Sequence, residues 1–131
     1  MVAALIRDDS GHLLLQRALT GKRHAGLWEL PGGKVEPGET PRAALVCEIK
    51  EELGIVLAEG ALAPAGFADE AGAEGSPAIV LFLYTCSPWA GTPEGRDGQQ
   101  WGWFTAHEAV ALALAPMDRA LLERLPPAMP G

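Results

Sequence analysis

Apolar and polar positions along the chain predict strands at its beginning and in its middle. Apolar side chains dominate residues 2–7 and 12–17, and the turn-forming run Asp-Asp-Ser-Gly at 8–11 separates them. This pattern predicts a β-hairpin. We expect further strands at 60–68, 78–86 and 100–104, with a loop of small residues at 69–77 between the first two.

A helix is predicted between Thr40 and Gly54. Thr40 is suited to cap its first turn, Pro41 to occupy its first position, and Gly54 to end it after Leu53. One stripe of this helix is apolar and suited to face a core. The residues of this stripe are Ala44, Leu45, Ile49 and Leu53.

Two shorter helices are predicted near the end of the chain. Thr105 and Glu108 have the spacing of a capping box, and a third helix is expected at 117–125, ended by the prolines at 126 and 127. Strands interleaved with helices predict a layered α+β fold. We expect residues 1–131 to form a single domain, because this length is ordinary for one core.

The charge balance argues against binding to a nucleic acid polymer. The chain has 17 acidic and 10 basic residues, a formal charge of -7, so a polyphosphate ligand would need a metal ion and local arginines. We expect no membrane association, because no apolar run approaches the roughly 18 residues of a membrane span. Residues 1–6 are too short for a signal peptide, and two cysteines do not make a disulfide scaffold. A cytoplasmic location is the simplest expectation.

Three carboxylates in the first predicted helix suggest a metal site. Glu48, Glu51 and Glu52 are related by i, i+3 and i+4, so they crowd one face, where like charges repel unless a cation lies among them. The glycines at 32 and 33 allow the backbone ahead of the helix to approach a ligand closely. A solvated acidic face is the alternative, but the glycine loop, the helix ends and the spacing together favour the metal site.

Residues 33–55 resemble the Nudix box, written G-x5-E-x7-R-E-U-x-E-E-x-G-U with U an aliphatic residue. Every fixed position agrees except the arginine, which is replaced by Cys47. The resemblance implies an α/β/α sandwich around a mixed β-sheet and an enzyme that hydrolyses a pyrophosphate bond. The matching residues are Gly33, Glu39, Glu48, Ile49, Glu51, Glu52, Gly54 and Ile55.

The resemblance also implies which residues bind the metal ion and which act as the general base. It implies Mg²⁺ as the cofactor, with Mn²⁺ as a substitute, since both are hard cations that accept oxygen ligands. Glu48 is the first candidate for the general base, and Asp97 is both the rival base and an extra ligand. The metal ligands that the resemblance implies are the carbonyl of Gly32 and the carboxylates of Glu48, Glu51, Glu52 and Asp97. Glu39 has two open interpretations, a metal role or a favourable charge at the helix start.

Two further stretches, 26–33 and 114–122, resemble the mutator-protein and CTP pyrophosphohydrolase types of this family. That resemblance implies hydrolysis of oxidised or modified nucleoside triphosphates to the monophosphate and pyrophosphate, which cleans the nucleotide pool. The substrate-binding residues that we expect from it are Arg17, Arg23, Glu29, Leu30, Pro31 and Asp118. For the two arginines plain surface charge stays open, and for Leu30 ordinary strand packing.

Several alternatives stay open at this stage. The chain could hydrolyse another nucleoside-diphosphate-linked substrate, such as a nucleotide sugar, a dinucleoside polyphosphate or coenzyme A. It could also be a weakened nucleotide-binding domain, because Cys47 cannot pair with carboxylates as a forked guanidinium does. Either Lys50 or Arg42 partly compensates for that arginine, or activity is impaired. The nucleobase stays open, as does the choice between monomer and homodimer.

Overall fold

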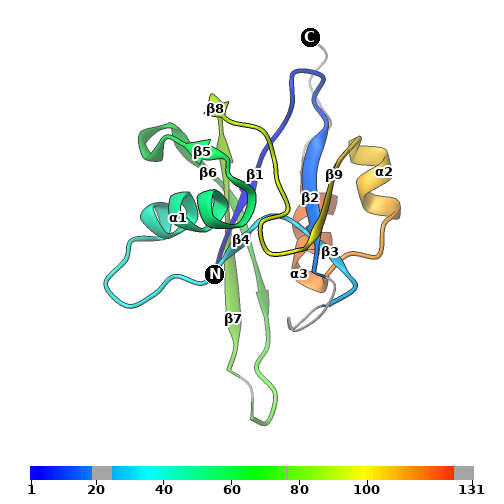
Figure 1. Cartoon of the computed structure of the whole chain (residues 1–131). Coiled ribbons are helices and arrows are strands. Elements are labelled where there is room, and N and C mark those ends of the chain that lie inside the picture. Colours follow the sequence, from blue (N-terminus) through cyan, green and yellow to red (C-terminus); the bar gives the residue numbers. More distant parts are fainter. Residues whose placement is uncertain (19–24, 76, 126–131) are drawn as a thin grey trace.

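The computed structural model describes residues 1–18, 25–75 and 77–125, which form short strands and three α-helices (Figure 1). The strands are β1 (Val2–Leu5), β2 (Leu13–Arg17), β3 (Trp28–Glu29), β4 (Gly32–Gly33), β5 (Val56–Leu57), β6 (Leu62–Glu70), β7 (Ile79–Cys86), β8 (Trp89–Ala90) and β9 (Gln100–Phe104). The helices are α1 (Pro41–Leu53), α2 (Ala106–Ala111) and α3 (Pro116–Arg124), with a 3-10 turn η1 (Glu59–Ala61).

A mixed four-stranded sheet in the order β4-β1-β7-β6 forms the centre of the fold. Strand β1 runs parallel to β7 and antiparallel to β4, and β6 and β7 form an antiparallel hairpin. This hairpin extends well beyond the helices in Figure 1. A second sheet has the order β3-β2-β9, and β5 pairs with β8. The sequences of the short segments β5 and β8 do not predict this last pairing.

Two cores lie on opposite faces of the central sheet. Val2 and Ala4 of β1 pack toward α1, whereas Ala3 and Leu5 pack into the core that includes α3. Figure 1 shows α1 on one side of the central sheet and α3 on the other. The predicted α+β fold, with helices on both faces of a mixed sheet, is therefore confirmed.

Helix α1 begins and ends where the sequence predicts. The side-chain oxygen of Thr40 accepts the N–H of Ala43 at 3.2 Å, and Pro41 is the first helical residue. Gly54 ends the helix in the left-handed conformation, with φ of 73°, and its N–H donates to the carbonyl of Lys50. The predicted capping box at Thr105 and Glu108 is also formed.

The predicted hairpin of residues 2–7 and 12–17 is wrong. The turn forms, with the Asp8 carboxylate accepting two backbone N–H groups, but β1 and β2 continue into different sheets and meet only through the Arg7–Leu13 bridge. The physical reason is that both edges of each strand are paired with other strands. Strand β1 lies between β4 and β7, and β2 between β3 and β9, so neither has a free edge along which the two could pair.

Other predicted elements shift by a few residues. The strands expected at 60–68 and 78–86 are 62–70 and 79–86, and the helix expected at 117–125 is 116–124. The expected stop at residues 126 and 127 lies outside the described residues. None of the described helices is both long and apolar enough to cross a membrane.

Candidate active site

Helix α1 presents the box glutamates along the edge of its buried stripe. Ile49 and Leu53 are fully buried, whereas Glu48 and Glu52 are half-buried and Glu51 is exposed. The same 3.6-residue period that buries the apolar residues therefore leaves the carboxylates at the edge of the core.

The glycine strand β4 lies against Glu48. A Cβ added to Gly33 would meet Oε2 of Glu48 at 2.6 Å, so a side chain at position 33 would displace this carboxylate. A Cβ on Gly32 would meet the carbonyl oxygen of Val2 at 2.0 Å, since β4 pairs closely with β1. Both glycines are thus required by close approach, one to the sheet and one to the site.

Glu52 is held by a neutral amide from β2. Nε2 of Gln16 donates to Oε2 of Glu52 at 3.2 Å, and Gln16 is 5% exposed. Gln16 lies opposite Glu29 on β3, and directly opposite residues project from the same face of a sheet. The predicted substrate residue Glu29 therefore shares its sheet face with the Gln16–Glu52 contact.

The loop at residues 94–99 brings Asp97 to the end of α1. The N–H of Glu94 donates to the carbonyl of Leu53 at 2.9 Å, and the N–H of Arg96 donates to that of Glu52 at 3.1 Å. Asp97 is exposed, and its own N–H donates to Oε1 of Gln99 at 2.9 Å. A segment far from the box in sequence thus meets the helix that carries the glutamates.

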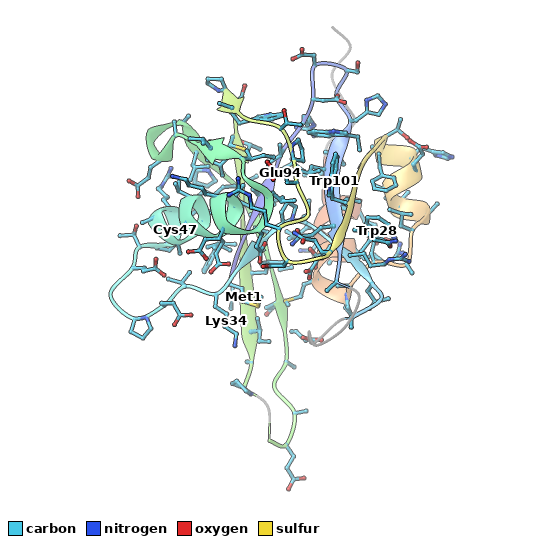
Figure 2. All side chains as sticks on the ribbon, in the orientation of Figure 1. Met1, Trp28, Lys34, Cys47, Glu94 and Trp101 are labelled. Atoms are coloured by element: carbon cyan, nitrogen blue, oxygen red, sulfur yellow. The ribbon has the colours of Figure 1, made fainter. Side chains whose placement is uncertain are left out.

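An open hollow of about 470 Å³ lies beside this loop. The guanidinium of Arg17 lies over the ring of Trp28, 5.2 Å from its centroid, and its Nε donates to Oε1 of Gln100 at 2.8 Å. Figure 2 shows Trp101 between α1 and Trp28. The residues that line the hollow are Arg17, Trp28, Gly95, Gln99, Gln100 and Trp101.

Asp118 is buried at the start of α3 and is hydrogen-bonded to the segment between β3 and β4. Its Oδ1 accepts the N–H of Leu30 at 2.9 Å, and it is 5% exposed. Burial raises the pKa of this carboxyl to about 6, although the backbone N–H donors act in the opposite direction. The side chain of Leu30 belongs to the core, which agrees with the strand-packing alternative.

Two expected substrate-binding residues remain, Pro31 and Arg23. Pro31 is buried, and its carbonyl accepts the N–H of Ala4 at 2.9 Å. Arg23 lies outside the described residues. Glu39 accepts the N–H of Glu36 at 3.0 Å in the loop before α1.

Cys47 is exposed on α1, beside Glu48 in sequence (Figure 2). Of the alternatives left open for the missing arginine, compensation by Arg42 does not agree with the contacts of this side chain. The Arg42 guanidinium binds the carbonyl of Leu62 and lies over the ring of Tyr84, 5.1 Å from its centroid. These contacts direct it to β6 and β7, away from the glutamates.

The chain belongs to the Nudix family, because the family described as NUDIX domain matches residues 1–125. It is a Nudix hydrolase, as the sequence resemblance predicts. A Haemophilus influenzae protein named 8-oxo-dGTP diphosphatase is 37% identical over 125 residues, covering 95% of this chain and 89% of that protein. An Escherichia coli protein named CTP pyrophosphohydrolase is 39% identical over 123 residues, covering 94% and 87%. The crystal structure of a MutT Nudix hydrolase from Burkholderia pseudomallei superposes with a TM-score of 0.82 at 30% identity, covering 95% of each chain.

The family implies a divalent cation, and the donor set of the site fits one. Glu48 and Glu52 offer carboxylate oxygens, the type of ligand that hard cations prefer, and the missing Cβ at Gly33 allows the Glu48 carboxylate to lie against β4. Within residues 1–18, 25–75 and 77–125, no three acidic, histidine or cysteine side chains lie together as a group that could hold a metal ion. A cation bound by Glu48 and Glu52 would therefore take its other ligands from water and the substrate phosphates.

Sequence reasoning predicted Arg17 at the hollow but missed the roles of Gln16, Gln100 and Trp101. Gln16 follows three leucines in β2 and carries no chemistry that a spacing argument can detect. Gln100 and Trp101 likewise gain a place in the site only because β9 pairs with β2. The one available signal was a polar amide at a position that the strand pattern buries.

Proposed function

We propose that this protein hydrolyses nucleoside triphosphates to the monophosphate and pyrophosphate in the presence of Mg²⁺, and thereby removes oxidised or otherwise modified nucleotides. The observation that carries the proposal is the position of Glu48 beside Gly33 and of Glu52 bonded to Gln16, next to a hollow lined by Arg17 and two tryptophans. The names of the two relatives, 8-oxo-dGTP diphosphatase and CTP pyrophosphohydrolase, support the same substrate class.

The hollow has the chemistry that a nucleotide requires. Trp28 and Trp101 present aromatic surface suited to a base, and the guanidinium of Arg17 is suited to phosphate oxygens. Gln99 lines the hollow and also binds the carbonyl of Glu52, so the hollow and the carboxylates are adjacent. A nucleotide bound in the hollow would thus place its phosphates near α1.

The reaction adds one water molecule across a phosphoanhydride bond. The water oxygen attacks one phosphorus of that bond, the bond from this phosphorus to the bridging oxygen breaks, and the products are the nucleoside monophosphate and pyrophosphate. A bound Mg²⁺ would supply charge neutralisation at the phosphate oxygens and lower the pKa of water. Glu48 is the first candidate to accept the proton, because it is half-buried beside the glycine strand, and Asp97 is the rival.

A product assay tests the proposal. The pure protein is incubated with Mg²⁺ and a panel of 8-oxo-dGTP, dGTP, CTP and a modified dCTP, together with ADP-ribose and a dinucleoside polyphosphate. We expect pyrophosphate from at least one triphosphate, and loss of that activity in Glu52→Gln. The matched control is Glu59→Gln, which changes an exposed glutamate of η1.

Three outcomes would contradict the proposal. Turnover of the diphosphate-linked compounds alone would favour a different Nudix substrate. Binding of a triphosphate without any release would favour a weakened binding domain. A fully active Glu52→Gln would refute the role given to this carboxylate.

A further inference from the structure

Gln16 is an unusual residue for its place in the fold. Gln16 and Asp118 are the two polar or charged residues among the buried side chains that the structure describes. Leu14 on the same face of β2 packs into the core under α1, so Gln16 projects toward the same helix. Burial of an amide costs free energy unless its donors and acceptor are hydrogen-bonded, and both ends of the Gln16 amide have partners.

Those partners are a carboxylate of the site and a second glutamine. Nε2 of Gln16 donates to Oε2 of Glu52 at 3.2 Å, and Oε1 of Gln16 accepts Nε2 of Gln99, also at 3.2 Å. Gln16 and Gln99 lie on different elements, since one is on β2 and the other immediately precedes β9. Both belong to the second sheet or its approach, and each donates to Glu52, so together they join this sheet to the box helix.

Gln99 extends this connection in two directions. Its Nε2 also donates to the carbonyl of Glu52 at 2.9 Å, and its Oε1 accepts the N–H of Asp97 at 2.9 Å. A backbone N–H can only donate and a carbonyl can only accept, so these two contacts fix which end of the Gln99 amide is which. The orientation of Gln16 then follows from that of Gln99.

The same loop is fastened to α1 by backbone bonds. Carbonyls in the last turn of the helix accept from Glu94 and Arg96, and the Arg96 guanidinium also donates to the carbonyl of Lys50 at 3.2 Å. A Cβ on Gly54 would meet Nη2 of Arg96 at 2.8 Å, so this guanidinium packs directly on the helix end. The helix and the loop are thus fastened together. Within them, the side chain of Gln99 is hydrogen-bonded to the backbone of both Glu52 and Asp97.

We infer that Gln16 and Gln99 are positioning residues that hold the Glu52 carboxylate and the Asp97 loop in a fixed relation, so that both can serve one divalent cation. The inference rests on the proposed function for the identity of the site. A neutral amide suits this task because it donates to Glu52 without adding a positive charge that would compete with the cation. Lysine or arginine at position 16 would orient Glu52 but also neutralise it.

Metal binding without nucleotide provides the direct test. The affinity for Mn²⁺ is measured by electron paramagnetic resonance of the free ion, for the wild type, Gln16→Met and Gln99→Met. Methionine approximates the length of glutamine and removes its hydrogen bonds. We expect each variant to bind Mn²⁺ roughly 10-fold or more weakly, as is typical when a partner of a metal ligand is removed. The matched control is Glu94→Gln in the same loop, which retains the backbone bond to Leu53 and should bind as the wild type does.

Two further measurements separate positioning from general stability. The double variant Gln16→Met with Gln99→Met should lose less affinity than the two single losses multiplied, because both act on the same carboxylate. In steady-state assays with the triphosphate, Gln16→Met should lower kcat about 10-fold or more while KM changes little, because Gln16 is not among the residues that line the hollow. Gln99→Glu, which keeps the acceptor for Asp97 but loses both donors, provides a second variant if Gln99→Met does not fold.

The outcomes distinguish this inference from the proposed function. Wild-type affinity for Mn²⁺ in both folded glutamine variants, or no Mn²⁺ binding by the wild type, would overturn the inference. Weakened Mn²⁺ binding in the variants would support it even if no triphosphate in the panel were hydrolysed, a result that would overturn the proposed function alone.

Discussion

The backbone of Gly33 lies so close to the carboxylate of Glu48 that a single added carbon would come within 2.6 Å of its Oε2. The first glycine of the box is therefore required because any side chain at this position would collide with a glutamate fifteen positions later. This contact links the strand β4 to the helix α1 at the point where the chemistry is proposed to occur.

Gly33→Ala should weaken metal binding and catalysis while leaving the fold intact. The added methyl group must displace Glu48, which is half-buried and cannot stay in its present place. We expect a fall in kcat of roughly 10-fold or more, measured with Mg²⁺ at saturating nucleotide. Gly60→Ala is the matched control, because a Cβ there meets nothing within 4 Å. Equal activity of the two variants would show that the contact is unimportant.

Cys47→Arg should increase metal-dependent turnover. An arginine at position 47 would lie one helical turn before Glu51 and next to Glu48, where its guanidinium can orient the carboxylates. Arg42 cannot take this role, since it binds Leu62 and Tyr84. We expect a gain of about 3-fold to 10-fold in kcat. Cys47→Gln, which adds length without charge, is the control, and an unchanged rate at saturating Mg²⁺ would refute the prediction.

Asp118→Asn should stabilise the protein more at high pH than at low pH. The pKa of Asp118 is about 6 in the folded protein and 3.8 when unperturbed, so the folded state disfavours the charged form. This penalty is absent below about pH 4, grows as the pH rises to 6, and is fully present above it. The asparagine oxygen still accepts the N–H of Leu30, so the gain in free energy of unfolding should reach up to roughly 3 kcal/mol.

Urea unfolding of both proteins between pH 4 and pH 8 measures this difference. Asp69→Asn, which removes an exposed carboxylate on β6, should show no comparable pH-dependent gain. A gain for Asp118→Asn that is the same at pH 4 and pH 8 would mean that titration of Asp118 is not its cause.

Arg17→Gln should weaken nucleotide binding more than it slows the chemical step. The guanidinium lies over Trp28 and is bound to Gln100 in the hollow, where it is suited to phosphate oxygens. We expect KM for the triphosphate to rise about 10-fold with a smaller change in kcat. Arg124→Gln, at the exposed end of α3, is the control. A fall in kcat at unchanged KM would place Arg17 outside the binding step.

Local chemistry made the box helix predictable from the sequence. Thr40, Pro41 and Gly54 act on neighbours within four residues, so their roles can be derived without knowledge of the sheet. The three carboxylates on one face follow from the same helical period. The positions of the glutamates on the helix were therefore available before any strand was placed.

The pairing of strands and the residues brought together by it were not predictable in this way. The pattern of 2–7 and 12–17 is satisfied equally by a hairpin and by two strands in different sheets, and the second arrangement forms because other strands occupy both edges of each. Gln16 and Gln99 meet only because β2 pairs with β9. Such long-range contacts depend on the whole topology, which local periodicity does not specify.

The parallel pairing of β1 with β7 also determines when the protein can fold during its synthesis. Val2 lies opposite Phe82, so the first strand leaves the ribosome long before its partner exists. The box glutamates emerge in between, but the amide of Gln99 that binds Glu52 emerges later still. A nascent chain that stops before residue 99 therefore contains the whole glutamate motif without its support, and it exposes an apolar strand that chaperones can bind.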